Sequence, residues 1–352
     1  MKKQSFALTF ATVLLLVGIT TALLIKAQAR SQGGNAAEGS RISAGEYTLS
    51  GPYTHNNLSM FLVHGRSLVA GNNFLTLQEA LQQKKVIVYE TKDVNELAIQ
   101  NLSDQDVYVQ SGDIVKGGQQ DRMISVDLIV PPRSGRMPIA AFCVEHGRWS
   151  GRGNEQAGVF SSSADVAATK EIKLAAKRSS SQGAVWESVT VAQDKLSQNV
   201  GTRVNSPVSE SSLQLAVENR KVRETAESYV SALSGIVKGK DDVIGYVFAI
   251  NGQVNSADVY ASSALFKKLW PKLLKANAIE AIAELQRDIK FEPTTAANVK
   301  LFLSEAETGD IEEKEVTQRV KLVTRENSKN IFFETRDRKQ KDGWVHRNYI
   351  KK

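Results

Sequence analysis

An acidic, a basic and an aromatic side chain directly follow an apolar run in "MPIAAFCVEHGRW", residues 137–149. The apolar run predicts a buried strand, and Gly147 permits a sharp turn at its end, where binding and catalytic groups are often placed. Glu145 is a candidate general base, Arg148 presents a fork suited to phosphate or carboxylate, and Trp149 offers a ring for stacking. The structural alternative is an ion pair between Glu145 and Arg148, with Trp149 packed over the edge of the core.

The one cysteine of the chain, Cys143, lies inside this apolar run. Residues three apart on a strand point to opposite faces, so a nucleophilic pair of Cys143 with His146 is not expected, and Cys143 is interpreted as a small buried side chain. A single cysteine excludes an intramolecular disulfide. One cysteine and four histidines also argue against a structural zinc site.

A second polar segment, "SGDIVKGGQQDRMISVD", spans residues 111–127. Its glycines and lysine match neither the P-loop nor the dinucleotide-binding spacing, so the Gly pair is interpreted as a β-turn. Lys116 and Arg122 are predicted to contact anionic oxygens, and Asp121 is the second candidate for a general base. If the strand runs on without a break, Asp121, Ser125 and Asp127 share one of its faces.

A third polar segment is "INGQVNSADVY", residues 250–260. Asn-Gly predicts a two-residue hairpin turn. Asn255 and Asp258 are candidates to hydrogen-bond a ribose or a base edge, and the alternative is a helix cap after the hairpin. No metal site is assigned; the acidic residues that could hold a divalent cation for a hydrolytic reaction are Asp121, Asp127, Glu145 and Asp258.

The order His-Gly-Arg occurs twice, in "VHGRS" at residues 63–67 and at residues 146–148. Both copies follow an apolar run. If the two strand ends are equivalent, His64, Arg66, His146 and Arg148 converge on one anion; otherwise the repeat is a coincidence of three residues.

The elements that must position these residues indicate an α+β fold. Short β-branched runs separated by Gly, Asn, Asp and Ser predict a β-rich N-terminal part, with a short helix in "FLTLQEALQQKK". Helical spacing predicts central helices within 175–196 and 211–237. A hairpin over 244–260, a helix from Ser262 that meets Pro271, and a C-terminal β-hairpin over 330–352 complete a single domain over 46–352.

The N-terminus has the features of an export signal. Lys2 and Lys3 precede an uncharged apolar run from Phe6 to Ile25, and a small-residue cleavage motif ends at Ala29. Residues 1–29 are predicted to be a signal peptide, or an N-terminal membrane anchor, and residues 30–45 a flexible linker. The protein is therefore expected to be exported, periplasmic or extracellular, or anchored to the membrane by the leader.

The net charge of +7 is concentrated at the C-terminus. Residues 317–352 hold eleven Lys/Arg and four Asp/Glu, which gives 11 − 4 = +7, so this segment is the expected contact for an acidic partner surface. Its aromatics, among them Trp344 and His346, stand between cations as in single-stranded nucleic-acid sites. The favoured interpretation is a solvated edge hairpin protected by its charges, with nucleic acid not expected as a partner.

The segments "GDIVKGGQQDRMISVDLIVPP", "PIAAFCVEHGRW" and "GYVFAINGQVNSADVYAS" resemble the ARG and rhodanese-phosphatase-superfamily-associated protein domain family, over about Tyr47 to Lys352. The family name records genomic association with ADP-ribosylglycohydrolases and rhodanese-type phosphatases, which implies a link to ADP-ribose or related phosphorylated nucleotides. The resemblance carries over no catalytic residue. It implies that Gln is common at the position of His146, which favours Glu145, Arg148 and Trp149.

Three functions fit these residues. The first is a binding module for an anionic, phosphorylated or nucleotide-like ligand, held by Lys116, Arg122 and Arg148. The second is a hydrolase acting on such a ligand, with Glu145 or Asp121 as general base. The third is a structural or interaction protein of the cell envelope. Export argues against an intracellular nucleotide as the everyday ligand and favours a binding or structural role. The sequence assigns no cofactor. The first two functions would be supported if one pocket were lined by Arg122, Glu145 and Arg148.

Overall fold

The computed structural model describes residues 47–68, 74–91, 93–179, 181–341 and 343–352, so the predicted leader and linker lie outside the described residues. Helices and sheets are both abundant and the N-terminal part is β-rich, which confirms the α+β prediction. The described residues, from Tyr47 onward, group into one compact unit. Within the described ranges, no helix combines the length and the apolar character that a membrane crossing requires.

The first layer is an eight-stranded sheet in which every neighbouring pair is antiparallel, in the order β1-β2-β12-β13-β17-β16-β15-β14. Its strands are β1 (Thr48–His55), β2 (Leu58–His64), β12 (Val243–Ile250), β13 (Gln253–Tyr260), β14 (Asp310–Glu315), β15 (Val320–Glu326), β16 (Asn330–Asp337) and β17 (Gly343–Lys351). The sheet therefore joins the start of the described chain to its C-terminal end.

The second layer contains a closed six-stranded barrel in the order β10-β5-β4-β11-β7-β8 and a small sheet β3-β6-β9. The barrel strands are β4 (Val86–Glu90), β5 (Glu96–Asn101), β7 (Asp113–Gly117), β8 (Arg122–Ile124), β10 (Met137–Cys143) and β11 (Val159–Ala167). The small sheet holds β3 (Leu75–Thr76), β6 (Val107–Val109) and β9 (Leu128–Val130). Side chains such as Val88, Ile99 and Ile139 form a core of their own in this part of the chain.

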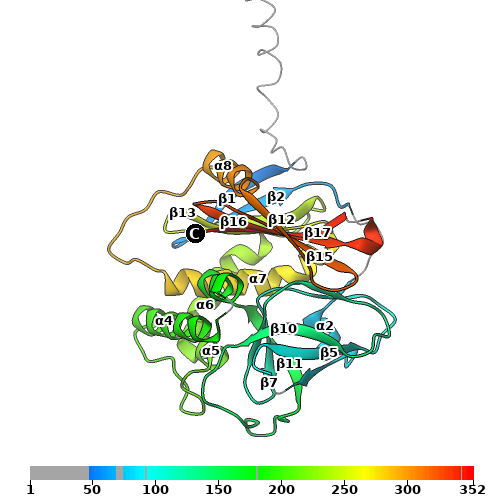
Figure 1. Ribbon diagram of the computed structural model, residues 1–352. Helices are drawn as coiled ribbons and strands as arrows, with labels where there is room; N and C mark the ends of the chain where they lie inside the picture. Colours follow the sequence, from blue (N-terminus) through cyan, green and yellow to red (C-terminus); the bar gives the residue numbers. More distant parts are fainter. Residues whose placement is uncertain (1–46, 69–73, 92, 180, 342) are drawn as a thin grey trace, which may run out of the picture. The chain divides into compact units, whose positions relative to one another are not determined.

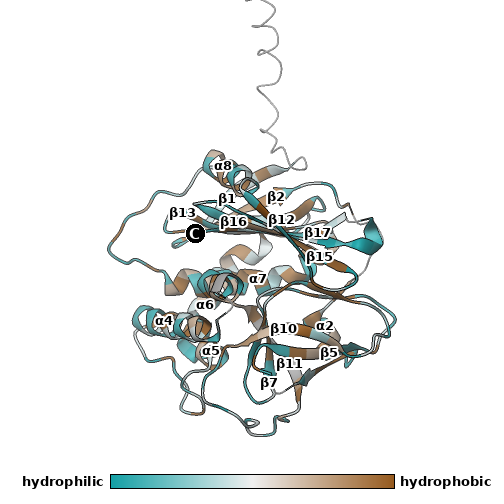
Figure 2. Cartoon of the chain, in the orientation of Figure 1, coloured by the Kyte–Doolittle hydropathy of each residue, from teal (hydrophilic) through white to brown (hydrophobic). Residues whose placement is uncertain are grey.

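The helices are α2 (Leu77–Gln82), α3 (Lys170–Leu174), α4 (Gln182–Val200), α5 (Leu213–Val217), α6 (Arg220–Leu233), α7 (Ser263–Ala283) and α8 (Ala296–Ala306). Shorter turns are η1 (Ala175–Ser179), which is π-helical, η2 (Ser234–Val237) and η3 (Arg338–Gln340). Brown and teal segments both occur along α4 in Figure 2, as expected for a helix with one buried face.

Alternate residues of the large sheet face different partners, as the two-residue period of a strand requires. Phe332 and Tyr349 pack with Val299 and Phe302 of α8. Tyr246 and Tyr260 face the other way and join the core that includes α7. Figure 1 shows α8 on one side of the sheet and α7, then the barrel, on the other.

Several predicted elements are confirmed. Thr76 closes a capping box with Glu79 at the start of α2. Asn251 and Gly252 form the two-residue turn between β12 and β13, both with positive φ as a type I′ turn needs. Ser262 caps α7, which continues through Pro271.

Other predictions need correction. The helix expected over 175–196 is divided into η1 and α4, and Ser181 caps the second piece. The helix expected over 211–237 is divided into α5 and α6, because Asn219 stops one and caps the next. Asn255 and Asp258 lie within β13 and not at a helix cap.

The C-terminal hairpin is present, but the prediction that it forms the edge of a sheet was wrong. β17 pairs with β13 and β16 pairs with β15, so both strands lie inside the sheet, and β14 is the edge. The segment that supplies α8, β14 and β15 was assigned no element in the sequence analysis. Every residue of β14 is exposed, and its charges suit an unpaired edge.

Candidate functional site

The predicted loop after β10 forms a buried network of ion pairs. Arg148 donates two hydrogen bonds to Glu145, from Nε to Oε1 and from Nη2 to Oε2, each over 2.8 Å. Arg152 donates from Nη1 and Nη2 to Asp121 over 2.9 and 2.7 Å. Asp121 and Glu145 are both fully buried. The structural alternative, an ion pair between Glu145 and Arg148, is therefore the arrangement in the protein, and Arg152 is a member that the sequence analysis missed.

Burial acts on the two carboxyl groups of this network with different results. For Asp121, burial raises the pKa, and the charge of Arg152 only partly offsets it. For Glu145, burial would also raise the pKa, but hydrogen bonds from Arg148 and other donors lower it overall. Asp121 also accepts a hydrogen bond from the backbone N–H of Gly117. Both carboxylates are thus occupied by protein donors.

Arg122 belongs to a separate buried cluster. Its Nη2 donates to Glu90 Oε1 over 2.9 Å, and its Nη1 donates to the carbonyl of Val94 over 2.6 Å. Arg122 is the first residue of β8, and its guanidinium bonds to residues 90–94, whereas Arg148 bonds to Glu145. None of the described cavities is lined by Arg122, Glu145 and Arg148 together. The arrangement that would have supported the first two functions is therefore not found there.

The other residues predicted near this loop are dispersed. Lys116 pairs with Glu218 at the end of α5. Trp149 is 55% exposed and so does not pack over the core edge. Cys143 is free and buried as predicted, and burial raises the pKa of its thiol to about 11. The binding roles of Lys116, Arg122, Arg148 and Trp149 stay predictions.

The repeated His-Gly-Arg segments do not form one anion site. His64 contacts Ser50 Oγ and Asp242 Oδ1 at the end of β2. His146 packs edge-on against Trp186, with ring centres 4.4 Å apart. Because Arg148 bonds to Glu145, the side chains of His64, His146 and Arg148 have different partners.

A cleft of about 700 Å³ lies between the barrel and the C-terminal strands of the large sheet. On the barrel side it is lined by residues from the β8–β9 connection and β10, among them Asp127 and Phe142, and η1 contributes Lys177. On the sheet side the lining includes Phe333, Thr335 and Asn348. Phe333 and Thr335 occupy alternate positions of β16, and Asn348 lies on the neighbouring strand β17, so this face of the sheet presents both apolar and polar side chains to the cleft.

The deepest part of this cleft adjoins a buried Asp-His-Asp cluster. His346 Nδ1 lies 2.7 Å from Asp127 Oδ2, and its Nε2 lies 3.0 Å from Asp258 Oδ1. His346 is 2% exposed. Its ring stacks on Tyr260, with ring centres 4.5 Å apart at an interplanar angle of 14°. The three segments that meet here come from the β8–β9 connection, β13 and β17.

The two carboxylates make His346 a cation. Burial alone would lower the pKa of His346, but the charges and hydrogen bonds of Asp127 and Asp258 raise it to about 9. Burial alone would raise the pKa of each aspartate, and the contacts with His346 instead lower both. At neutral pH the cluster therefore holds two negative charges and one positive charge.

Neutral donors complete the cluster. Thr335 Oγ1 donates to Asp127 Oδ2 over 2.7 Å, and the backbone N–H of Ser111 donates to Asp127 Oδ1 over 2.7 Å. Tyr246 Oη and Asn348 Nδ2 each donate to Asp258 over 2.8 Å. With these bonds the charged groups are satisfied inside the protein, as buried charges must be.

Lys177 is the remaining charged group in the deep part of the cleft. Its ammonium lies 3.6 Å from the centre of the Phe333 ring, a cation–π contact. Burial lowers the pKa of Lys177 to about 8, and the charge of Asp127 opposes that change. Within the described residues, the ammonium makes no hydrogen bond to an acceptor. A donor is therefore left for a ligand in the cleft.

Three of these four groups were named from the sequence in other roles, and the fourth was not. Asp258 was a predicted ligand-binding residue, and Asp127 was named only as an acidic residue that could hold a cation. His346 was seen as part of a basic hairpin, and Lys177 was not singled out. The alternation in "WVHRNY" places His346 and Asn348 on one face, which is the one signal that could have joined them.

No arrangement of three or more His, Cys, Asp and Glu side chains suited to a metal ion occurs in the parts of the chain that the structure describes. Asp127 and Asp258 are held apart by His346, and Asp121 and Glu145 are neutralised by arginine. Asn255 lies in a different cavity, where it contacts Glu280.

A family model for the ARG and Rhodanese-Phosphatase-superfamily-associated Protein domain matches residues 46–350. The chain belongs to this family. The match spans both layers of the fold and therefore contains the cleft, the Asp-His-Asp cluster and the Glu145–Arg148 network. Comparison with curated proteins and with solved structures gave no match.

Proposed function

We propose that the protein binds a small molecule that carries an anionic group and an apolar ring, in the cleft between the barrel and the C-terminal strands. The observation that supports it most directly is Lys177, a cation that has no hydrogen-bond acceptor among the described residues and that lines a cleft of about 700 Å³. A phosphate or carboxylate is the acceptor that an ammonium group binds as a point charge. Phosphorylated and nucleotide-like molecules remain the proposed class.

The walls of the cleft suit the rest of such a ligand. Phe142 and Phe333 offer apolar surface, and Thr335 and Asn348 offer polar groups close to Asp127. Ligand cavities commonly combine an apolar lining with a few polar groups that fix orientation. The volume lies within the range of about 300–1,000 Å³ that small-molecule sites have.

Binding is favoured over hydrolysis because Asp127, the buried carboxylate in the lining of the cleft, is not available as a base. Asp127 lines the cleft, but its oxygens accept from Ser111, Thr335 and His346, and its pKa is lowered. A carboxylate with a low pKa is a weak base at neutral pH. The hydrolase hypothesis based on Glu145 or Asp121 stays a prediction, and their arginine partners weigh against it.

The envelope-interaction hypothesis has weaker support from the C-terminal cations. Arg319 pairs with Asp106 and Asp337, and Arg338 and Lys321 pair with Glu315 and Glu313 of β14. Neighbouring carboxylates therefore neutralise part of the excess charge of residues 317–352. Export remains a proposal from the N-terminal sequence, and it bears on which anionic molecule the protein meets.

The experiment is thermal unfolding of the full-length protein with AMP, ADP-ribose, sugar phosphates, benzoate and inorganic phosphate, followed by calorimetric titration of any compound that stabilises it. A ligand at 100 times its Kd stabilises the native state by about 2.7 kcal/mol. Lys177→Gln should weaken binding at least tenfold. Lys339→Gln, which removes an exposed cation, should leave the Kd within about twofold.

Two outcomes would contradict the proposal. One is the absence of binding by every compound. The other is binding that survives Lys177→Gln but is lost in Trp149→Ala, since Trp149 is exposed and its removal disturbs little of the fold. That result would indicate that the ligand binds at the loop after β10 and not in the cleft.

A further inference from the structure

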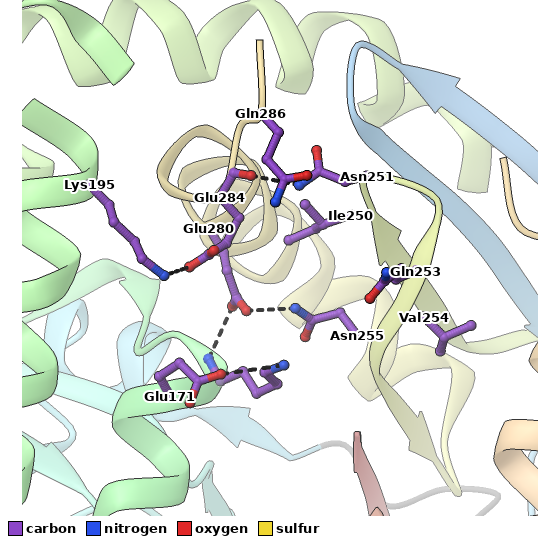
Figure 3. A pocket seen from close by; sticks show the side chains of 11 residues that line it. Glu171, Lys195, Ile250, Asn251, Gln253, Val254, Asn255, Glu280, Glu284 and Gln286 are labelled. Carbon is purple, nitrogen blue, oxygen red and sulfur yellow. Dashed lines mark hydrogen bonds and ion pairs between the residues drawn. The ribbon is translucent and has the colours of Figure 1, made fainter. Parts of the chain in front are cut away.

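A second cavity, of about 230 Å³, lies between β13, the start of α3 and the C-terminal half of α7. It shares no lining residue with the cleft that contains Lys177. Figure 3 shows the carboxylate of Glu280 reaching from α7 toward Asn255 of β13 and the first turn of α3. This cavity was not recognised as a site from the sequence, although Asn255 was a predicted ligand-binding residue.

Glu280 is a buried carboxylate held by neutral donors. Asn255 Nδ2 donates to its Oε1 over 2.9 Å, and the backbone N–H of Lys170 donates to its Oε2 over 3.1 Å. Glu280 is 7% exposed, and burial raises its pKa. Among the described residues, no lysine, arginine or histidine lies within ion-pair distance of it, so the carboxylate lacks an adjacent counter-charge.

The lysines around the cavity are paired with other acids. Lys170 Nζ lies 3.4 Å from Glu171 Oε1, and Lys195 Nζ lies 2.6 Å from Glu284 Oε1. Figure 3 shows the dashed line from Lys195 to Glu284, and Glu171 on the other side of Glu280. Lys173 acts on Glu280 at longer range and acts on Asp258 as well. The paired charges balance each other, and Glu280 is the acidic group at the inner end that has no such partner among the described residues.

Asn255 supplies a second, independent sign of an absent ligand. It is 8% exposed, and its Oδ1 has no hydrogen-bond partner in the described part of the chain, although its Nδ2 is bonded to Glu280. A buried acceptor left unpaired is costly. Each oxygen of Glu280 also keeps a lone pair, because it accepts only one of the bonds described above. The inner end of the cavity therefore presents hydrogen-bond acceptors.

We infer that this cavity binds the protonated amino group of a small molecule, with N–H groups donated to Glu280 and to Asn255 Oδ1. An ammonium group has three donors and no acceptor, which matches the acceptors that the cavity presents. It also places a positive charge beside the buried carboxylate. A neutral polyol would satisfy Asn255 Oδ1 but would leave Glu280 without a counter-charge.

The size of the cavity limits the ligand to a compact amine. A volume of about 230 Å³ corresponds to roughly eight waters at about 30 Å³ each. The inference does not depend on the proposed function, because the two cavities have different linings. If the test of one proposal fails, the other proposal is unaffected.

The test is calorimetric titration of the full-length protein with ethanolamine at constant ionic strength. Ethylene glycol is the matched neutral probe, and tetramethylammonium is the matched cation without N–H donors. Ethanolamine should bind saturably, and the other two should bind at least tenfold more weakly. Absence of ethanolamine binding, or equal binding of ethylene glycol, would overturn the inference.

Variants locate the site. Glu280→Gln keeps the size of the side chain and removes the charge, so it should weaken ethanolamine binding at least tenfold. Asn255→Asp adds a second carboxylate beside the amine and should retain or tighten binding, which provides a readout if Glu280→Gln does not fold. Glu224→Gln, an exposed glutamate of α6 that lines neither cavity, should change the Kd by less than about twofold. Unchanged binding in Glu280→Gln would also overturn the inference.

Discussion

His346 donates a hydrogen bond from Nδ1 to Asp127 Oδ2 over 2.7 Å, although 219 residues separate the two in the chain. The other ring nitrogen faces Asp258 Oδ1, so the imidazole lies between two carboxylates. Since a ring that donates from both nitrogens is an imidazolium, the geometry and the raised pKa agree on a positive charge. This cation holds the β8–β9 connection against β13 and β17, and so fixes the wall of the cleft.

Replacing His346 should strongly destabilise the fold. His346→Gln leaves Asp127 and Asp258 buried without their shared cation, which typically costs about 3–5 kcal/mol. Urea unfolding of the variant and the wild type measures the change. His146→Gln is the control, since His146 is exposed, and a loss below about 1 kcal/mol is expected. Equal stability of the two variants would show that the cluster contributes little.

The same histidine predicts a fall in stability at alkaline pH. The pKa of His346 is about 9 in the folded protein and 6.5 as the ordinary value. Because the folded state binds this proton more tightly, its contribution is complete below about pH 6.5 and is lost as the pH rises through 9. The loss amounts to about 3 kcal/mol. The difference in free energy of unfolding between wild type and His346→Gln should shrink over this window, and a constant difference would contradict the prediction.

The arginine network after β10 gives a prediction about stability. Arg148→Ala removes both hydrogen bonds to the buried Glu145 and should destabilise the protein by about 3 kcal/mol. Arg133→Ala breaks an ion pair with Asp104 in which both side chains are mostly exposed, and should cost less than about 1 kcal/mol. Chemical denaturation compares the two. Similar losses in the free energy of unfolding would mean that the buried ion pair of Glu145 contributes no more to stability than an exposed pair.

Lys177 should be reactive at a lower pH than an ordinary lysine. Burial lowers its pKa to about 8, and its amine lines the cleft. Brief acetylation with acetic anhydride across pH 6–11, followed by peptide mass spectrometry, should give a midpoint near pH 8 for this residue. In urea-unfolded protein the midpoint should move to about 10.4. A native midpoint above that of the unfolded protein would contradict the assignment, and an anionic ligand should protect the native residue.

Cys143 should be unreactive until the protein unfolds. It is fully buried, and burial raises the pKa of its thiol to about 11, so little thiolate exists at neutral pH. Ellman's reagent should label one thiol per chain in denaturant and less than about a tenth of that in the native protein within an hour. Rapid native labelling would show that the end of β10 opens readily.

The local elements near strong turn and cap signals follow from the sequence alone. Asn251 and Gly252 determine a hairpin because both accept positive φ. Thr76, Glu79 and Ser262 determine helix starts because their side chains satisfy the first free N–H groups. The α+β class, the buried Cys143 and the family could likewise be predicted before any tertiary contact was known.

Only the tertiary structure decided which polar residues meet. A sequence shows that Glu145 and Arg148 are neighbours, but whether they face a ligand or each other depends on Arg152, Asp121 and the burial around them. Hydrogen bonds from His346 to Asp127 and Asp258 span 219 and 88 residues, and no local pattern encodes such a distance. β17 lies beside β13 inside the sheet, and this position buries His346. The sequence had indicated an exposed histidine, because basic residues surround it.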